Sequence, residues 1–459
     1  MESKPPKVKT NYYLCREKQR QRNTRAMENK SQQHQLTAFL CGQFTTLKES
    51  DKTQPLLVKS GWQREPEDTC EVYANQYVPD FIDYCFCNDD KNGCVAFYRP
   101  IDKEFTVTTD GKSHRAQLKE LKLYLFPHHI VLFSIEINYA SQHLNDLTSL
   151  IRYLRLMHES GNDEFNEMAI EPLLDAYSLL DGKNYCPDPH KLIEHGNKMR
   201  LFQIIVSPEE LQLTDSQREL TLYQLGSLAH EVNPDKDDLD NVSDSYLERM
   251  MANNRVSVFK RWMALALNDT FTLHANGDKN NFMTEWRGFF RLLYTHSLFQ
   301  KYYLSGLNER YHSTIVESEE NWWKTFKRVC RRRVTPIEAL TQEFQIYNSH
   351  GCFNRVSYNF LPLEIDRAID RGLEVNDEQQ QLNEMLQSSH NYIQERNNAQ
   401  TKALLVAISI LTVFSALCDV CDLSFNALRG DYSAFYKIVA TISIVLLAVF
   451  IAFFVRKRH

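Results

Sequence analysis

The sequence predicts an α+β cytosolic domain followed by long stalk helices and two C-terminal transmembrane helices. Short β-rich runs alternate with helical patterns at first, long helical patterns follow, and two uncharged apolar runs stand near the end. Alternation between period 2 and period 3.6 indicates strands and helices of one mixed domain. The predicted division is a flexible basic tail over 1–35, a cytosolic α/β domain over 36–276, a helical stalk over 277–400 and a transmembrane domain over 401–459.

Composition is that of a folded protein with no strong charge bias. The 459 residues are 43% hydrophobic and 24% charged, with a formal net charge of -6. A general nucleic-acid binder needs a basic surface to neutralise phosphates, so direct nucleic-acid binding is not expected. The basic N-terminal stretch lacks an apolar run behind it and is not a secretory signal. We therefore expect the body of the protein in the cytosol, with its 11 cysteines reduced.

The first half of the predicted domain is mainly β-structure. The segments 94–98 and 105–108 are short and rich in strand-forming residues, with Gly and Asp beside them. The apolar runs 121–126 and 130–135 are separated by Pro127-His128-His129, which predicts a hairpin. The second half alternates: apolar residues at helical spacing predict helices over 141–158 and 164–180, and strands are expected over 201–206 and within 258–274.

Long helices are predicted from residue 281 onward. Segment 282–316 carries a dense apolar and aromatic stripe, which is typical of helix packing rather than of a cofactor site. Segment 361–400 is predicted to be the last cytosolic helix and to continue unbroken into the membrane.

Two apolar runs predict transmembrane spans at about 403–423 and 438–455. At ~1.5 Å per residue the second run is about 27 Å long, enough to cross the hydrocarbon layer. Basic residues flank both outer ends, which places the N- and C-termini in the cytoplasm of a multi-pass protein of the inner (plasma) membrane. The lipid bilayer is then a partner. The alternative is a pair of buried helices in a soluble protein.

A polar seam along the first span predicts pore-lining residues. Steps of three and four bring alternating polar and apolar side chains to one helix face, which in a symmetric oligomer would surround a central axis. Alternatively, the aspartates mark a helix end in interfacial water, and the hydroxyls bond to carbonyls of their own helix. The predicted residues are Asn398, Thr401, Leu405, Ile408, Thr412, Ser415, Asp419 and Asp422.

This layout resembles the CorA family of divalent-cation channels. The resemblance rests on the polar run His390–Asn398 before the first span and on the basic end Val455–Arg458. It implies a homo-oligomer, typically a pentamer, with the first span around the pore. The family's Gly-Met-Asn signature is missing: Cys421–Asn426 stands in its place, and Asn426 alone corresponds, as a further pore residue. A CorA-like group without this signature acts in type III CRISPR antiviral defence and is opened by a nucleotide messenger, the S-adenosylmethionine–AMP conjugate.

A basic aromatic segment is the candidate contact for such a ligand, because anionic nucleotides need basic and aromatic partners. The same segment could lie against lipid headgroups or be a solvated face. Its residues are Trp322, Trp323, Lys324, Lys327, Arg328, Arg331, Arg332 and Arg333.

Two functions remain open as alternatives to a homo-oligomeric ion channel that a cytosolic ligand opens. A constitutive magnesium or divalent-cation transporter would use internal acidic clusters such as Asp235–Asp240 for regulation. A membrane-anchored cytosolic enzyme would need catalytic motifs, and the chain has no Walker loop, G-x-S-x-G, H-E-x-x-H or G-x-G-x-x-G. The protein is therefore predicted not to be an enzyme.

No cofactor is required by these predictions, although magnesium could be a permeant or regulatory ion. Two groups of residues are candidate zinc ligands, and neither group has a full set of four ligands at the usual spacing. Buried thiols are the preferred interpretation of the cysteines, and the histidines 114, 128 and 129 are expected to be surface or core residues. The zinc candidates are Cys85, Cys87 and Cys94, and Cys186 with His190.

Overall fold

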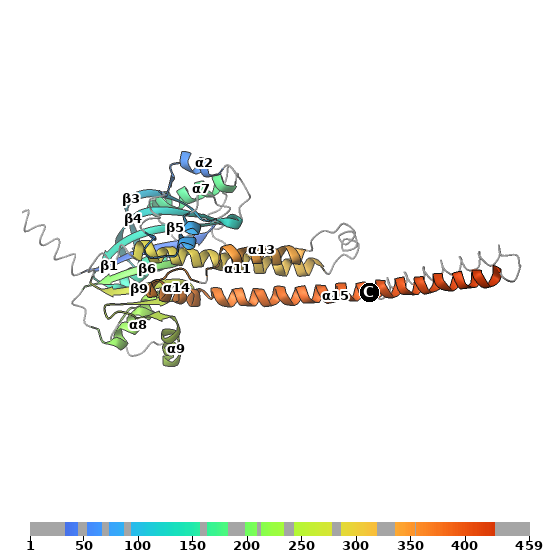
Figure 1. Ribbon diagram of the computed structural model, residues 1–459. Helices are drawn as coiled ribbons and strands as arrows, with labels where there is room; N and C mark the ends of the chain where they lie inside the picture. The colour runs from blue at the N-terminus through green and yellow to red at the C-terminus, as the bar shows by residue number, and fades with distance from the viewer. Residues whose placement is uncertain are drawn as a thin grey trace, which may run out of the picture. The chain divides into compact units, whose positions relative to one another are not determined.

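The structure is a computed structural model, and it describes most of the chain between residues 33 and 426 (Figure 1). The described residues fall into units 1–383 and 384–459, and the second unit contributes only residues 384–426. The ranges described are 33–44, 53–66, 73–86, 93–156, 163–181, 198–208, 213–233, 243–277, 286–318, 336–353 and 355–426.

A nine-stranded sheet forms the centre of the first unit. The strand order is β2-β3-β4-β5-β1-β6-β9-β8-β7, and β6–β9 is the only parallel pair among these strands. The strands are β1 (His34–Gln43), β2 (Gln63–Arg64), β3 (Val95–Thr109), β4 (Lys112–Phe126), β5 (Ile130–Ser141), β6 (Arg200–Ser207), β7 (Arg255–Val256), β8 (Trp262–Ala266) and β9 (Thr270–Asn276).

The predicted hairpin is confirmed and belongs to a longer meander of β3, β4 and β5. β3 unites the two short strands that were predicted separately. Asp110 and Gly111, with φ of 51° and 75°, form the two-residue turn between β3 and β4, as hairpin twist requires. The β4–β5 turn, Pro127–His129, holds both histidines at positive φ.

One face of the sheet is covered by a mainly aliphatic core. Leu36, Ala38 and Leu40 point to this face because side chains alternate along β1. The helices that pack there were predicted at 141–158 and 164–180, and both are confirmed, the second with a π-helical turn. The helices of the first part are α2 (Thr53–Lys59), α4 (Pro79–Cys85), α5 (Leu144–Leu154), α6 (Asp163–Phe165), η2 (Asn166–Ile170), α7 (Glu171–Asp181), α8 (Asp215–Gly226) and α9 (Asp244–Asn254).

The opposite face of the sheet packs against a long aromatic helix. Phe39 of β1 and Phe202 of β6 lie 5.8 Å apart (ring centroids), and Phe202 lies 5.4 Å from Tyr294. This helix, α11 (Arg291–Ser318), is preceded by the π-helix η4 (Trp286–Phe290). The helical prediction for 282–316 is thus confirmed over the described residues, and the aromatic stripe is core, as expected.

The last three helices are α13 (Pro336–His350), α14 (Phe360–Leu373) and α15 (Val375–Asn426). The prediction of one unbroken helix over 361–400 is wrong, because Glu374 takes a left-handed conformation with φ of 58° and ends α14. A residue at positive φ cannot continue a right-handed helix. α15 begins directly afterwards and runs to Asn426.

Within the described residues, none of the helices has the length and hydropathy that a membrane crossing needs. This contradicts the predicted span at 403–423, and with it the fold class with two transmembrane helices, the membrane-protein and ion-channel assignments and the multi-pass location in the inner membrane. The run between Lys402 and Asp419 is uncharged over only 16 residues, whereas a span takes about 20. The predicted span 438–455 lies outside the described residues.

Candidate functional site

A charged pocket of about 470 Å³ lies where β3, β4 and β5 meet η4 and the start of α11. Cavities of this size are typical of small-molecule sites. The face of the sheet that it occupies is the one that packs against α11. The pocket is lined by Tyr98, Pro100, Asp102, Lys119, Glu120, Glu136, Arg287, Gly288 and Arg291.

Three local irregularities meet at this pocket. The β3–β4 register shifts between Pro100 and Lys103, and the β4–β5 register shifts between Leu118 and Glu120. Consecutive strand residues normally face opposite sides, so the second shift explains how Lys119 and Glu120 can both line the pocket. The third irregularity is the π-helix η4. Bulges and π-helical turns are frequent at functional sites because they redirect side chains.

Two glutamates lie directly opposite each other on the floor of the pocket. Glu120 of β4 and Glu136 of β5 are partners in the strand register, and Glu136 is in turn opposite Phe39 of β1. Like charges in this position repel each other. Arg291 offsets the repulsion, because its guanidinium lies 3.3 Å from Glu120 and 3.7 Å from Glu136 and stacks 4.7 Å above the ring of Phe39.

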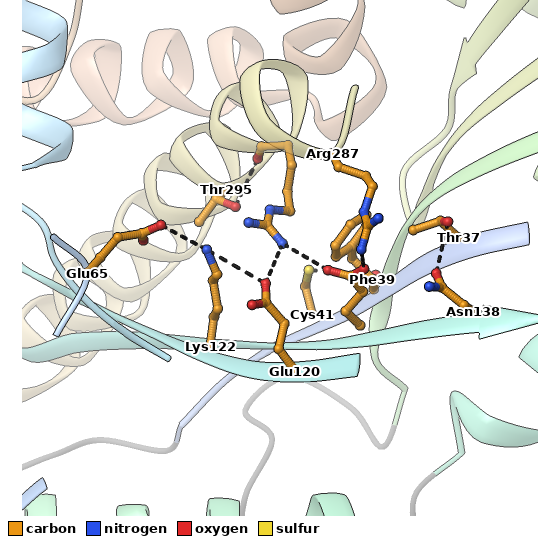
Figure 2. Close-up of polar contacts among 11 residues, drawn as sticks. Thr37, Phe39, Cys41, Glu65, Glu120, Lys122, Asn138, Arg287 and Thr295 are labelled. Atoms are coloured by element: carbon orange, nitrogen blue, oxygen red, sulfur yellow. Dashed lines mark hydrogen bonds and ion pairs between the residues drawn. The ribbon is translucent and has the colours of Figure 1, made fainter. Parts of the chain in front are cut away.

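The charges continue on both sides of Arg291 as an alternating chain. On one side Lys122 lies 3.7 Å from Glu120 and 3.0 Å from Glu65 (Figure 2). On the other side Arg287 donates a hydrogen bond to Glu136. Burial is tolerable for these groups because each charge has at least one opposite neighbour.

The two floor carboxyls differ in proton affinity. Burial would raise the pKa of Glu120, but Lys122 and Arg291 outweigh it and hold that pKa below its usual value. Burial dominates at Glu136 and raises its pKa despite Arg291 and Arg287. Burial also opposes the charge of Arg291, yet Tyr124 and the two glutamates hold its pKa above the ordinary value. Glu120 is therefore the more acidic of the pair.

The rim of the pocket is open to solvent and is also charged. Lys119 lies 2.7 Å from Asp102, which also accepts a hydrogen bond of 2.8 Å from Gln117. Arg287 is 39% exposed, whereas its partner Glu136 is only 4% exposed. The lining thus has three cationic and three anionic side chains but no Ser, Thr, Cys or His. Such a lining can bind and orient a polar molecule through side chains of both charges.

α11 connects this pocket to the helices that follow it. Arg291, in the pocket, is its first residue. One turn and a half further on, the Ser297 hydroxyl donates to Asp370 of α14 over 3.1 Å. Lys301, in the next turn, lies 2.6 Å from Glu378 in the first turn of α15. One helix therefore contacts both the pocket and the start of α15.

The predicted pore-lining residues lie on α15, in the second unit. Leu405, Ile408, Thr412 and Ser415 are exposed. The Thr412 hydroxyl donates to the Ser409 carbonyl over 2.9 Å, as in the alternative interpretation of the seam. The side chains of the other five, Asn398, Thr401, Asp419, Asp422 and Asn426, lie outside the described part.

The predicted ligand segment 322–333 and the acidic cluster 235–240 both lie outside the described residues. Cys87, Cys186 and His190 also lie outside the described residues. Cys85 and Cys94 are buried, as the interpretation of the cysteines as buried thiols predicts. Within the described ranges, no group of three or more His, Cys, Asp or Glu side chains could hold a metal ion.

The histidines 114, 128 and 129 lie in the core or at the surface, as expected. His114 is buried and forms hydrogen bonds of 2.8 Å to Thr109 and to Tyr139. His128 is exposed, but its Nδ1 atom lies 3.8 Å from Glu343, a carboxylate partner that the sequence did not indicate.

The sequence-based predictions did not include this pocket. One available signal was a charged residue between apolar ones in a buried strand, as in Ile135-Glu136-Ile137. A second was the i, i+4 pair Arg287 and Arg291 within an aromatic stripe. Comparisons of the chain with protein-family models, curated proteins and solved structures found no match. The resemblance to the CorA family therefore stays a prediction.

Proposed function

We propose that the protein is a sensor that binds a small polar ligand in the pocket between the β3–β5 meander and α11. The observation that carries this proposal is the lining, with three cationic and three anionic side chains around a cavity of about 470 Å³. Structural ion pairs alone do not require an open cavity above them. An exposed Arg287 next to a buried glutamate offers a ligand both a charged donor and a fixed acceptor.

The ligand class follows from the lining. Arginine binds carboxylate or phosphate through paired donors, and the glutamates and Asp102 accept from ammonium or hydroxyl groups. Tyr98 offers an aromatic ring for stacking. A nucleotide conjugated to an amino acid carries all of these groups. The S-adenosylmethionine–AMP conjugate implied by the CorA resemblance is a compound of this kind.

The output of the sensor is proposed to be α15. α11 contacts the pocket through Arg291 and contacts α15 through Lys301 and Glu378. A ligand that alters the position of α11 would alter these contacts, because a helix moves largely as a rigid element. The apolar side chains of α15 are proposed to serve self-association in a homo-oligomer, since Leu405, Val406, Ile408, Ile410 and Leu411 are 49–58% exposed.

The proposal is tested by titrating the full chain with adenine and guanine nucleotides, amino acids and the S-adenosylmethionine–AMP conjugate in a calorimeter. We expect one compound to bind, and Arg287→Met to weaken it at least about tenfold, the size of one lost charge-assisted contact. Arg115→Met is the matched control, because Arg115 is an exposed arginine of β4 that pairs with Glu104 outside the pocket. Equal binding by both variants, or binding of none of the compounds, would overturn the proposal.

A further inference from the structure

Glu136 occupies the position that the acidic group of a ligand would be expected to take. Its carboxylate accepts from Arg287 and lies 3.7 Å from Arg291, so it contacts both arginines of the pocket. The Glu136 side chain is 4% exposed, and its register partner on β4 is another carboxylate, Glu120. Any anion that approaches the two arginines therefore meets a site whose charge is already balanced.

From this geometry we propose that Glu136 is the specificity-determining residue of the pocket and makes it reject simple anions in favour of ligands that also carry a cationic group. The inference rests on the proposed function, because it concerns what the same pocket accepts. It names a ligand class: small molecules that pair an acidic group with an ammonium or other cationic group close by.

The physical reason is the cost of an unpaired buried charge. A simple anion that binds Arg287 must draw it from Glu136, which leaves that carboxylate with Arg291 alone and with Glu120 opposite. Leaving a buried charge without its partner costs more free energy than a new contact at the surface gains. A ligand with a cationic group can give Glu136 a new counter-ion while its own acidic group binds the arginine, so the exchange leaves no charge unpaired.

The neighbouring charges cannot replace this partner. Lys122 is held by Glu65 at 3.0 Å and by Glu120 at 3.7 Å on the far side of Arg291. Lys119 is held by Asp102 at 2.7 Å on the rim. Each remaining cation around the pocket is thus already paired, and the donor that Glu136 needs must come from the ligand.

Inorganic phosphate is the probe that tests the inference, because it has no cationic group. Phosphate would be titrated calorimetrically into the full-length wild type, Glu136→Gln and the double variant Glu136→Gln/Arg287→Met. Glutamine keeps the size of the side chain but removes the negative charge that neutralises the two arginines. We expect Glu136→Gln to bind phosphate at least about tenfold more tightly than the wild type, and the double variant to lose the gain.

Glu104→Gln is the matched control, since it frees the exposed Arg115 on the same sheet and should gain no phosphate affinity. If Glu136→Gln fails to fold, Glu136→Asp, which keeps the charge but shortens its reach to Arg287, should show a smaller gain. Wild-type and Glu136 variants that bind phosphate equally would overturn the inference.

The two proposals fail in different ways. A nucleotide that binds the wild type through Arg287, together with no gain of phosphate binding in the Glu136 variants, would leave the sensor standing and remove the role of Glu136. A phosphate gain that depends on Arg287, with no compound bound by the wild type, would support the role of Glu136 and remove the sensor.

Discussion

Lys301 of α11 lies 2.6 Å from Glu378 of α15, and the lysine is buried. The contact joins the helix that starts in the pocket to the helix that ends the described chain. The second oxygen of Glu378 is buried and has no protein hydrogen-bond partner. Lys301 is therefore the main compensation for the charge of this carboxylate.

Lys301→Met is predicted to destabilise the first unit by about 1–2 kcal/mol, because it leaves the partly buried carboxylate of Glu378, one oxygen of which is enclosed, without a counter-ion. Urea unfolding followed by tryptophan fluorescence measures the change. The double variant Lys301→Met/Glu378→Met should recover much of the loss, since two apolar side chains leave no unpaired charge. Glu364→Gln, in an exposed pair with Arg367, is the control and should change stability by less than about 0.5 kcal/mol. A double variant as unstable as the single one would contradict this account.

Gly372 of α14 is predicted not to tolerate a side chain. A Cβ atom there would lie 2.7 Å from the Cβ of Ala266 in β8 and 2.9 Å from its carbonyl carbon. Gly372→Ala must therefore push α14 off the sheet, at a cost of about 1–3 kcal/mol. Gly306→Ala in α11 is the control: it meets open space, and alanine should raise stability by up to about 1 kcal/mol. Thermal unfolding of the two variants should shift in opposite directions.

The sequence predicted local structure well where the pattern repeats along the chain. The β4–β5 hairpin, the helices after β5 and the helix that begins near Trp286 all follow from apolar periodicity. It failed at Glu374, where one non-glycine residue at positive φ ends α14. No composition signal marks this position, because glutamate is a good helix former. The prediction of a membrane span at 403–423 is also wrong, because the run between Lys402 and Asp419 is uncharged over only 16 residues, fewer than the about 20 that a span takes.

The pocket could not be predicted, because its residues meet only in the folded sheet. Glu120 and Glu136 become neighbours through the β4–β5 register, and Arg291 reaches them from a helix more than 150 residues later. The register shift beside Lys119 reverses the normal alternation, so no strand pattern places Lys119 and Glu120 on the same cavity. Charged residues in buried strands are the part of the signal that a sequence can provide.

Two buried histidines are predicted to make stability fall in mild acid. Ser207 bridges His34 and His274 with hydrogen bonds of 2.8 and 2.7 Å. Burial, and then the charge of His143, lowers the pKa of His34 to about 4, and burial, then His34 and Arg218, lowers that of His274 to about 3. Both lie below the unfolded value of about 6.5, so the unfolded chain binds more protons as pH falls.

The stabilisation from these neutral histidines is complete above about pH 6.5 and is lost as the pH falls from about 6.5 to 3. The loss should reach about 2 kcal/mol for each histidine at pH 4.5. Urea unfolding at a series of pH values checks this. His274→Gln, which cannot titrate, should flatten the pH dependence relative to the wild type. A variant with the same slope would show that carboxyl groups alone cause the acid sensitivity.

Self-association through α15 is the last prediction. Leu405, Val406, Ile408, Ile410 and Leu411 point in different directions around the helix and are all exposed. One neighbouring helix covers a single stripe, so a bundle of three or more copies is expected rather than a dimer. Sedimentation of the full chain should show this bundle. The double variant Leu405→Gln/Ile408→Gln should raise the dissociation constant of the bundle at least about tenfold. Val58→Gln, at another exposed apolar residue, is the control. A monomer whose apolar side chains are covered by detergent or lipid vesicles instead would contradict the prediction.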